Sequence, residues 1–299
     1  MILISLLIFQ KRGSIKKRLM IPLILTIFCS TTITLLLKYN EEKKGQPIVL
    51  LMSNYFVASL ICLILLVITP NTKYSFITFG FGAALAFIFV FSFFIFTKAV
   101  AVAGAALASV SARLSVIIPI ILSIIIFSEQ PDSNQVVGFL LALITIILFY
   151  FSLKIVSLGK LKLLDYSYLF LLLLGIGFND FCMKIFQHWR SEIEEPFFLF
   201  SIFTFAFIYT LTYSFIKQIK VERSTMIRGA ILGIPNVFSS YFLLGALAQL
   251  PAIIVYPVTN VSIILLTTLG AAIIWKERLN VFGKFALIIG CVAILFLSC

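Results

Sequence analysis

Long uncharged apolar runs alternate with short polar segments along the whole chain. The runs that we expect to form helices cover residues 20–38, 47–69, 76–98, 104–127, 134–153, 164–186, 195–217, 226–248, 250–274 and 280–298. A helix rises ~1.5 Å per residue, so about 20 residues cross the ~30 Å hydrocarbon core of a membrane. Strands of a membrane barrel alternate over ~10 residues, a pattern that these runs lack. The sequence therefore predicts an all-α integral membrane protein with ten transmembrane helices.

Two of these runs resemble each other. Residues 104–129 and 252–277 both end in a lone glutamate, and a short polar link and another apolar run follow each. The two glutamates, Glu129 and Glu277, lie 148 residues apart in a chain of 299. Self-similarity at half the chain length indicates an internal duplication. In a membrane protein it predicts two repeats with a solute path between them.

The duplication divides the chain into four parts. We expect residues 1–19 to be a cytosolic leader, 20–153 the first five-helix repeat, 154–163 a basic linker and 164–299 the second five-helix repeat. The native start stays open between Met1 and Met20. Because five is an odd number of helices, the second repeat must enter the membrane upside down relative to the first. Many secondary transporters contain inverted repeats of this kind.

Composition supports the membrane class and narrows the partners. Hydrophobic residues make up 62% and charged residues 11%, against about 45–50% and about 25% in soluble domains. The mean hydropathy is +1.18. The formal charge of +12 comes from basic residues in short loops beside the apolar runs. Such residues set topology and contact lipid head groups, so we expect the lipid bilayer and not nucleic acid as a partner.

The orientation signals conflict. Five basic residues precede the first span, and the first helix usually dominates topology, which favours a cytosolic N-terminus. The count of basic residues in the loops favours the opposite orientation. We expect a multi-pass protein of the cell membrane, the inner membrane in a diderm bacterium, with its N-terminus in the cytosol.

The sequence predicts no bound metal, no cofactor and no enzymatic activity. The five cysteines (Cys29, Cys62, Cys182, Cys291 and Cys299) form no CxxC pair, and His188 is the single histidine. The GxSxG, HExxH and Walker motifs are absent. Without a nucleotide-binding loop, transport would be driven by a gradient, such as a proton or ion gradient.

Arg113 stands in the middle of the fourth predicted span. An arginine at this depth costs roughly 2.5–3.5 kcal/mol on insertion scales and nearly always faces the bundle interior or a water-filled cavity. We expect it to bind a substrate anion or to couple charge, and the alternative is a structural interhelical pair. Ser109 lies one turn before it on the same face. Pro119 and Pro257 are expected to kink their helices and free backbone carbonyls.

Asp180 is the only acidic residue well inside a predicted span, and Asn179 is beside it. The pair is a candidate proton- or cation-coupling site, or Asp180 is the counter-charge of Arg113. The alternative is an i,i+4 pair with Lys184.

Further polar residues lie on one face of the eighth and ninth spans. The candidate substrate-binding residues are Arg113, Ser109, Asn236, Ser240, Tyr256 and Asn260. Interhelical hydrogen bonds alone would also explain the polar members of this set.

The chain resembles the drug/metabolite transporter superfamily, and within it the ten-helix EamA type. The resemblance rests on LASVSARLSVIIPIILSIIIFSE followed by GFLLALITIILFY, on IVYPVTNVSIILLTTLGAAIIWKERLNVFGKFALIIGCVAILFL, and on Lys38 and Lys184, which close the first helix of each repeat. It covers about residues 20–298. It implies inverted five-helix repeats around a central cavity, with alternating access to substrates such as amino acids, other metabolites, sugar phosphates or lipophilic cations.

The expected function is a secondary transporter that exports a small metabolite such as an amino acid or an organic anion. Arg113 would repel cationic drugs, and the first helix lacks the glutamate that drug-exporting relatives use. The alternatives are a sugar-phosphate or nucleotide-sugar type exchanger and a lipophilic drug exporter of the same fold. From another class, the chain could be a lipid flippase subunit or a non-transporting membrane partner. A monomer and a homodimer are both open.

Overall fold

The computed structural model describes residues 14–152, 163–190, 192–276 and 281–298. This part of the chain is helical and contains no strand. The elements are α2 (Ser14–Glu42), α3 (Pro47–Ile68), α4 (Phe76–Leu114), α5 (Ile117–Phe127), α6 (Ser133–Ser152), α7 (Leu163–Trp189), η2 (Glu192–Glu194), α8 (Glu195–Ile216), α9 (Arg223–Leu247), α10 (Ala252–Ile274) and α11 (Val281–Ser298).

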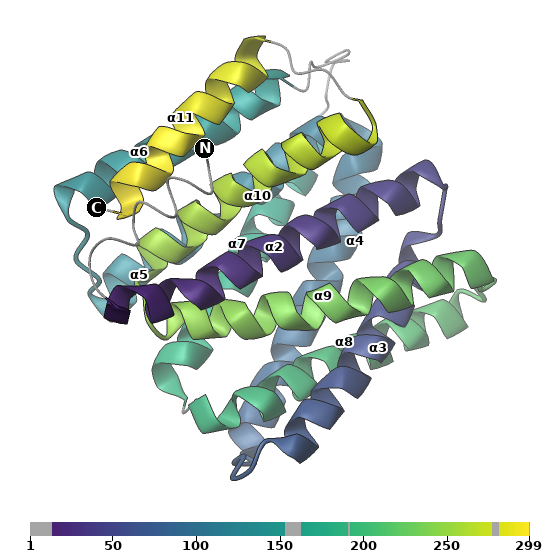
Figure 1. Cartoon of the computed structure of the whole chain (residues 1–299). Coiled ribbons are helices and arrows are strands. Elements are labelled where there is room, and N and C mark those ends of the chain that lie inside the picture. Colours follow the sequence, from purple (N-terminus) through teal and green to yellow (C-terminus); the bar gives the residue numbers. More distant parts are fainter. Residues whose placement is uncertain (1–13, 153–162, 191, 277–280, 299) are drawn as a thin grey trace.

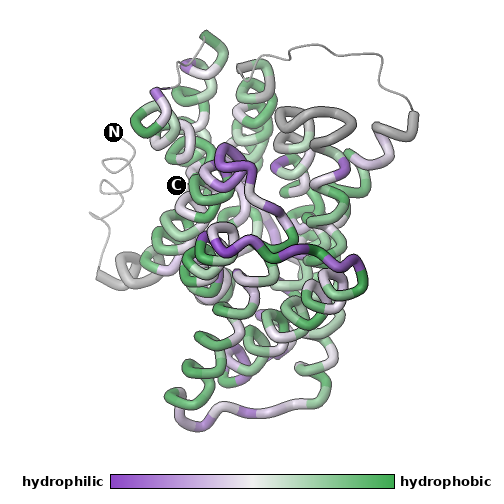
Figure 2. The backbone as a smooth tube through the Cα atoms, turned by 90° about the vertical axis from the view of Figure 1, so that its right-hand side faces the viewer, coloured by the Kyte–Doolittle hydropathy of each residue, from purple (hydrophilic) through white to green (hydrophobic). Residues whose placement is uncertain are grey.

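The described helices have the length and composition of membrane spans. Seven helical segments are long and apolar enough to cross a membrane, and three shorter apolar helices accompany them. These ten segments overlap the ten predicted spans, which confirms the all-α membrane class. Hydrophobic colouring dominates the helices in Figure 2, and hydrophilic stretches are short.

One predicted boundary is wrong. We expected a break between the third and fourth spans, at residues 98–104, but α4 continues as one helix to Leu114. The stretch is rich in alanine, the best helix former, so nothing forces the chain to stop there. The interruption falls instead at Ser115, inside the predicted fourth span.

Pro119 explains the position of that interruption. Proline has no backbone N–H, so Pro119 cannot donate to the carbonyl of Ser115 four residues earlier, and its ring clashes with it. The N–H of Ile118 donates to this carbonyl instead, at 2.9 Å. This interruption agrees with the expected effect of Pro119, whereas α10 runs past Pro257 without a break.

Each packed pair of helices has a counterpart, in which both helices are replaced by their equivalents from the other half of the chain. In Figure 1, α6 and α11 lie side by side at one edge of the bundle, and α3 and α8 lie at the opposite edge. Between them, α2 packs on α9 as α7 packs on α4, and α3 packs on α9 as α8 packs on α4. Likewise α10 contacts α2 and α5 contacts α7. A pseudo-two-fold relation between two repeats would produce these pairings.

Two glycines show the same relation in detail. Gly229 of α9 lies so close to α3 that a Cβ atom would be 2.3 Å from the carbonyl oxygen of Leu50 and 2.9 Å from Cβ of Ser53. Gly82 of α4 approaches α8 in the same way, and its Cβ would be 2.6 Å from Cβ of Ser201. Small residues at such points let membrane helices come together closely. The glycine–serine contact occurs once in each pairing.

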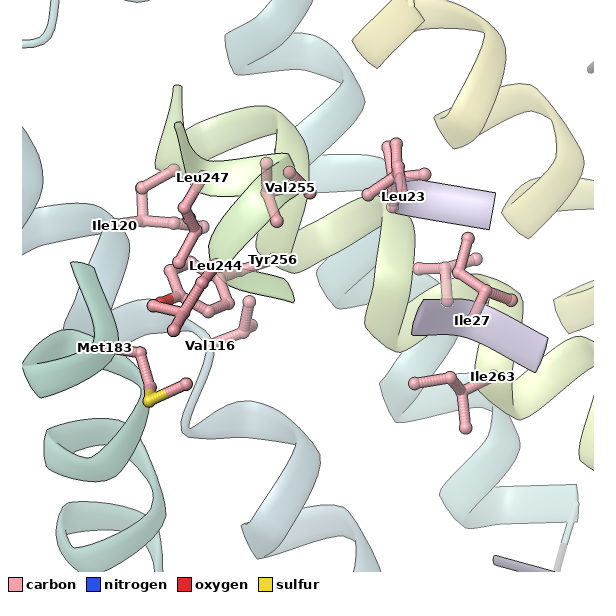
Figure 3. Close-up of a cluster of buried hydrophobic side chains, with 14 of the residues drawn as sticks. Leu23, Ile27, Val116, Ile120, Met183, Leu244, Leu247, Val255, Tyr256 and Ile263 are labelled. Carbon is pink, nitrogen blue, oxygen red and sulfur yellow. The ribbon is translucent and has the colours of Figure 1, made fainter. Parts of the chain in front are cut away.

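The interior is closed by apolar side chains from several helices. Figure 3 shows Leu23 and Ile27 of α2 near Ile263 of α10, and Leu244 and Leu247 of α9 near Ile120 of α5. Tyr256 of α10, 2% exposed, lies in the second group, close to Val116 at the α4–α5 junction. This packing fixes the depth of the polar residues next to Tyr256.

Candidate functional site

Arg113 lies in the last turn of α4, directly before the break caused by Pro119. Its side chain is half-buried. Nη1 donates a hydrogen bond to Oδ1 of Asn260 on α10, at 3.1 Å. Asn260 is itself fixed, because its Nδ2 donates to the carbonyl of Tyr256 at 3.0 Å. Two of the predicted site residues, Arg113 and Asn260, are therefore in direct contact.

Tyr256 and Asp180 complete the same cluster. The hydroxyl of Tyr256 donates to the backbone carbonyl of Asp180, which ties α10 to α7. The half-buried carboxylate of Asp180 interacts electrostatically with Arg113. This arrangement agrees with Asp180 as the counter-charge of Arg113. The alternative, an i,i+4 pair between Asp180 and Lys184, does not hold. Nζ of Lys184 pairs instead with Oε1 of Glu129, just after the end of α5, at 3.0 Å.

The cluster keeps unused hydrogen-bonding capacity. Arginine has five N–H donors, and among the described contacts Arg113 uses one. The carboxylate of Asp180 accepts no hydrogen bond from the described residues. Asn179, 7% exposed, donates to Oγ of Ser92 at 3.3 Å, but its buried Oδ1 has no partner in the described part of the chain. Buried polar groups are normally satisfied, so free groups of this kind suit a ligand.

The other predicted residues do not join this cluster. Asn236 of α9 donates to Oδ1 of Asn54 on α3, at 3.1 Å. Ser240 is half-buried, and no described contact links it to Arg113. The side chain of Ser109 lies outside the described residues. Substrate binding by these three residues stays a prediction.

Glu129 forms a second polar centre that we had not placed in the site. Its carboxylate pairs with Lys184 and accepts the backbone N–H of Ala252 at 3.0 Å, at the start of α10. A carboxylate at a helix N-terminus also interacts favourably with the helix dipole. The repeat comparison had singled out both Glu129 and Lys184, but only the fold shows that they pair. Glu277 lies outside the described residues. Lys38, which closes the first helix of the first repeat as Lys184 closes that of the second, lies over the ring of Trp275 at 4.7 Å.

The sequence of the chain is similar to a protein family and to a bacterial protein. The profile of the EamA-like transporter family matches residues 2–151, half of the chain. A protein of Haemophilus influenzae described as uncharacterized is 27% identical over 185 residues, which cover 61% of this chain and 62% of that protein. The match thus spans about three fifths of the length of that relative.

A solved structure has a similar fold. A crystal structure described only as that of a protein superposes with a TM-score of 0.74 at 13% identity, and covers 94% of this chain and 95% of its own. At this identity the likeness shows a shared fold. The apolar helices of the bundle define a multi-pass membrane protein. By its sequence, the chain belongs to the EamA-like transporter family of the drug/metabolite transporter superfamily.

Proposed function

We propose that the protein is a secondary transporter of a small zwitterionic metabolite, such as an amino acid, with Arg113 and Asp180 in its binding site. The observation that carries the proposal is the presence of two opposite charges on the packed helices α4 and α7, each with hydrogen-bonding groups that no described residue uses. Arg113 has one described hydrogen bond. The carboxylate of Asp180 accepts none from the described residues and interacts electrostatically with Arg113. A substrate carboxylate would bind to Arg113 in a bidentate manner, and a substrate ammonium would bind to Asp180.

The helix break gives this site a means of moving. Substrate contacts at Arg113 would act on the α4–α5 junction, where Pro119 has removed a backbone hydrogen bond. Discontinuous helices at the membrane midplane form the binding sites of many secondary transporters. The proposed mechanism is alternating access between two inverted repeats, driven by an ion or proton gradient. Export is the direction that the resemblance to this superfamily favours.

The substrates of the alternative functions differ from a zwitterion in their charge. A sugar phosphate would bring a doubly charged group to Arg113, but Asp180 beside it would repel that group. A lipophilic cation would suit Asp180 and be repelled by Arg113. The pair of charges thus favours a zwitterion, and next to it a monocarboxylate.

Thermal stabilisation of the purified protein by candidate substrates tests the proposal. A ligand that binds the folded state alone at 100 times its Kd stabilises it by about 2.7 kcal/mol. We expect amino acids, and not sugar phosphates or lipophilic cations, to raise Tm of the wild type. Arg113→Gln and Asp180→Asn should each abolish that shift.

Lys217→Gln is the matched control, since it removes one exposed positive charge at the end of α8. This variant should keep the full ligand-induced shift. Equal stabilisation of wild type and Arg113→Gln by every ligand would make Arg113 structural and refute the proposal. Stabilisation by a sugar phosphate that Arg113→Gln removes would support the exchanger alternative instead.

A further inference from the structure

A hollow of about 490 Å³ opens on the surface between α2 and α9. Cys29, Thr32 and Leu36 line it from α2, and α9 contributes Pro235 and Phe238 among others. The hydroxyl of Thr32 donates to the carbonyl of Phe28 at 2.9 Å, so the polar atom of its side chain is satisfied within its own helix. The walls of the hollow are therefore apolar. Both helices are membrane spans, so the medium next to this groove is hydrocarbon.

A basic residue lies at one end of the groove. Arg228 is one helical turn before the first lining residue of α9, Ile231, and Asn40 is one turn after Leu36 on α2. Nε of Arg228 donates to Oδ1 of Asn40 at 2.8 Å, and Nη2 donates to Oγ1 of Thr225 at 3.0 Å. Nη1 has no described partner. The guanidinium thus closes the groove at the membrane boundary with part of its donors free.

Arg228 differs from Arg190, which follows α7 and contacts the start of α4 in the other repeat pairing. There Arg190 bonds to the carboxylate of Glu194 at 2.9 Å, which neutralises its charge, and also to Thr78. The described partners of Arg228 are an amide and a hydroxyl. The nearby carboxylate of Glu222 accepts hydrogen bonds from Ser224 and Thr225, and these bonds together with the charge of Arg228 hold its pKa below the usual value. Glu222 interacts with Arg228 electrostatically, but no described hydrogen bond joins the two residues.

The chain around Arg228 is basic as a whole. Residues 38–44 and 217–228 contain seven basic and three acidic residues, a net charge of +4. They form the C-terminal end of α2, the N-terminal end of α9 and the links beside them. A positive segment at the boundary of a membrane attracts anionic head groups.

We propose that this groove is a binding site for an anionic phospholipid. One acyl chain lies along the groove between α2 and α9, and the phosphate accepts hydrogen bonds from Arg228. Arginine suits this role because its planar donor fork matches phosphate oxygens. A bound lipid would hold α2 against α9, next to the hydrogen bond between Ser30 and Ser239, at 2.6 Å. The site is separate from the Arg113 cluster and does not depend on the proposed substrate.

Quenching of a single tryptophan by brominated lipids tests this site. Phe238→Trp places a probe in the groove, in a background of Trp189→Phe and Trp275→Phe, and the protein is reconstituted into vesicles. We expect brominated phosphatidylglycerol to quench this probe at least about twofold more strongly than brominated phosphatidylcholine at equal mole fraction. Adding Arg228→Gln should make the two lipids equal.

Phe87→Trp is the control for ordinary boundary lipid, because Phe87 is exposed on α4, 60% accessible, away from the groove. Both lipids should quench it equally. Equal quenching of Phe238→Trp by both lipids, unchanged by Arg228→Gln, would show boundary lipid alone and overturn the proposal. No quenching of Phe238→Trp by either lipid would mean that another occupant fills the groove, with the same consequence.

Thermal unfolding of the wild type with unmodified lipids gives a second measurement. Phosphatidylglycerol should raise Tm more than phosphatidylcholine, and Arg228→Gln should lose the difference. Lys73→Gln, which removes an exposed charge outside residues 38–44 and 217–228, should keep it. Inorganic phosphate should give no comparable shift. If phosphate alone reproduces the effect, the site binds a free anion and the acyl-chain assignment is wrong.

Discussion

Charged side chains inside this bundle are held by partners on other helices. Lys184 and Glu129 are 7% and 13% exposed and join α7 to the end of α5. Arg113 of α4 is held by Asn260 of α10 and interacts electrostatically with Asp180 of α7. The first pair is fully engaged, because Glu129 also accepts the N–H of Ala252. The second keeps free donors and acceptors, and this difference separates a structural pair from a candidate binding site.

The engaged pair leads to a prediction about stability. Removing one partner of a buried ion pair leaves an uncompensated charge and costs roughly 3–5 kcal/mol. We expect Lys184→Met to lower the free energy of unfolding by about 3 kcal/mol, and Lys184→Met with Glu129→Gln to recover most of that loss. Denaturant unfolding of the four proteins of the double-mutant cycle measures the coupling. Additive effects of the two substitutions would contradict a direct pair.

For single residues, the sequence could indicate candidates for a functional site but not the residues that they contact. Arg113 and Asp180 stand out because charges are rare inside apolar runs. The contact of Arg113 with Asn260 also agrees with the prediction that both belong to one site. Arg228 was not singled out, because a basic residue at a helix start looks like any loop charge. Only its place at the end of the α2–α9 groove distinguishes it.

Helix packing depends on a few close approaches. Gly229 brings α9 against α3, and Gly82 brings α4 against α8. The spacing of apolar residues predicted the helices, but these contacts need the pairing of segments that are far apart in sequence. The start of α4 was predicted well, but its end was not, and the cause there is local. Local propensity carried the helix through residues 98–104, and one proline decided where it stopped.

Glycine substitutions test these approaches. Gly229→Ala would place Cβ 2.3 Å from a backbone oxygen of Leu50, which cannot move without shifting α3. Overpacking of this kind typically costs about 1–3 kcal/mol. Gly80→Ala is the control, because a Cβ there meets nothing within 4 Å. We expect a lower Tm for the first variant and an unchanged or slightly higher Tm for the second. Equal values for both would show that α9 and α3 are less tightly packed.

The helix break at Ser115 can be tested through Pro119. In Pro119→Ala the new N–H can donate to the carbonyl of Ser115 and continue α4 into α5. We expect unfolding stability to be kept or raised, by up to about 1 kcal/mol for the added hydrogen bond. The ligand-induced Tm shift should nevertheless fall, because Arg113 would turn with the straightened helix. A variant that binds ligand like the wild type would show that the break has no role at the site.

Over the whole molecule, the pairings of helices repeat between the two halves. The sequence predicted a duplication from two similar runs, and the packing of α2 on α9 and α7 on α4 agrees with it. The family profile matches the first half alone, so the second half rests on this internal likeness. The boundaries at residues 20–153 and 164–299 stay predictions, as does the inverted orientation.

Labelling from the two sides of the membrane tests that orientation. With five helices per repeat, the α2–α3 link and the α8–α9 link lie on one side of the membrane, and the α3–α4 link lies on the other. In a background without cysteine, Lys43→Cys and Lys220→Cys should react with an impermeant maleimide from the same side, and Lys73→Cys from the opposite side only. All three residues are exposed at helix ends, so each thiol is accessible.

The same experiment resolves the conflict between the basic leader and the basic loops. If Lys43→Cys and Lys220→Cys react from outside intact cells, the N-terminus is cytosolic and the first helix has set the topology. Reaction of Lys73→Cys from outside would place the +4 segment at the ends of α2 and α9 in the cytosol, as the loop count favours. The proposed lipid site would then face the leaflet that is richest in anionic lipid. Reaction of all three from one side would refute the inverted repeats themselves.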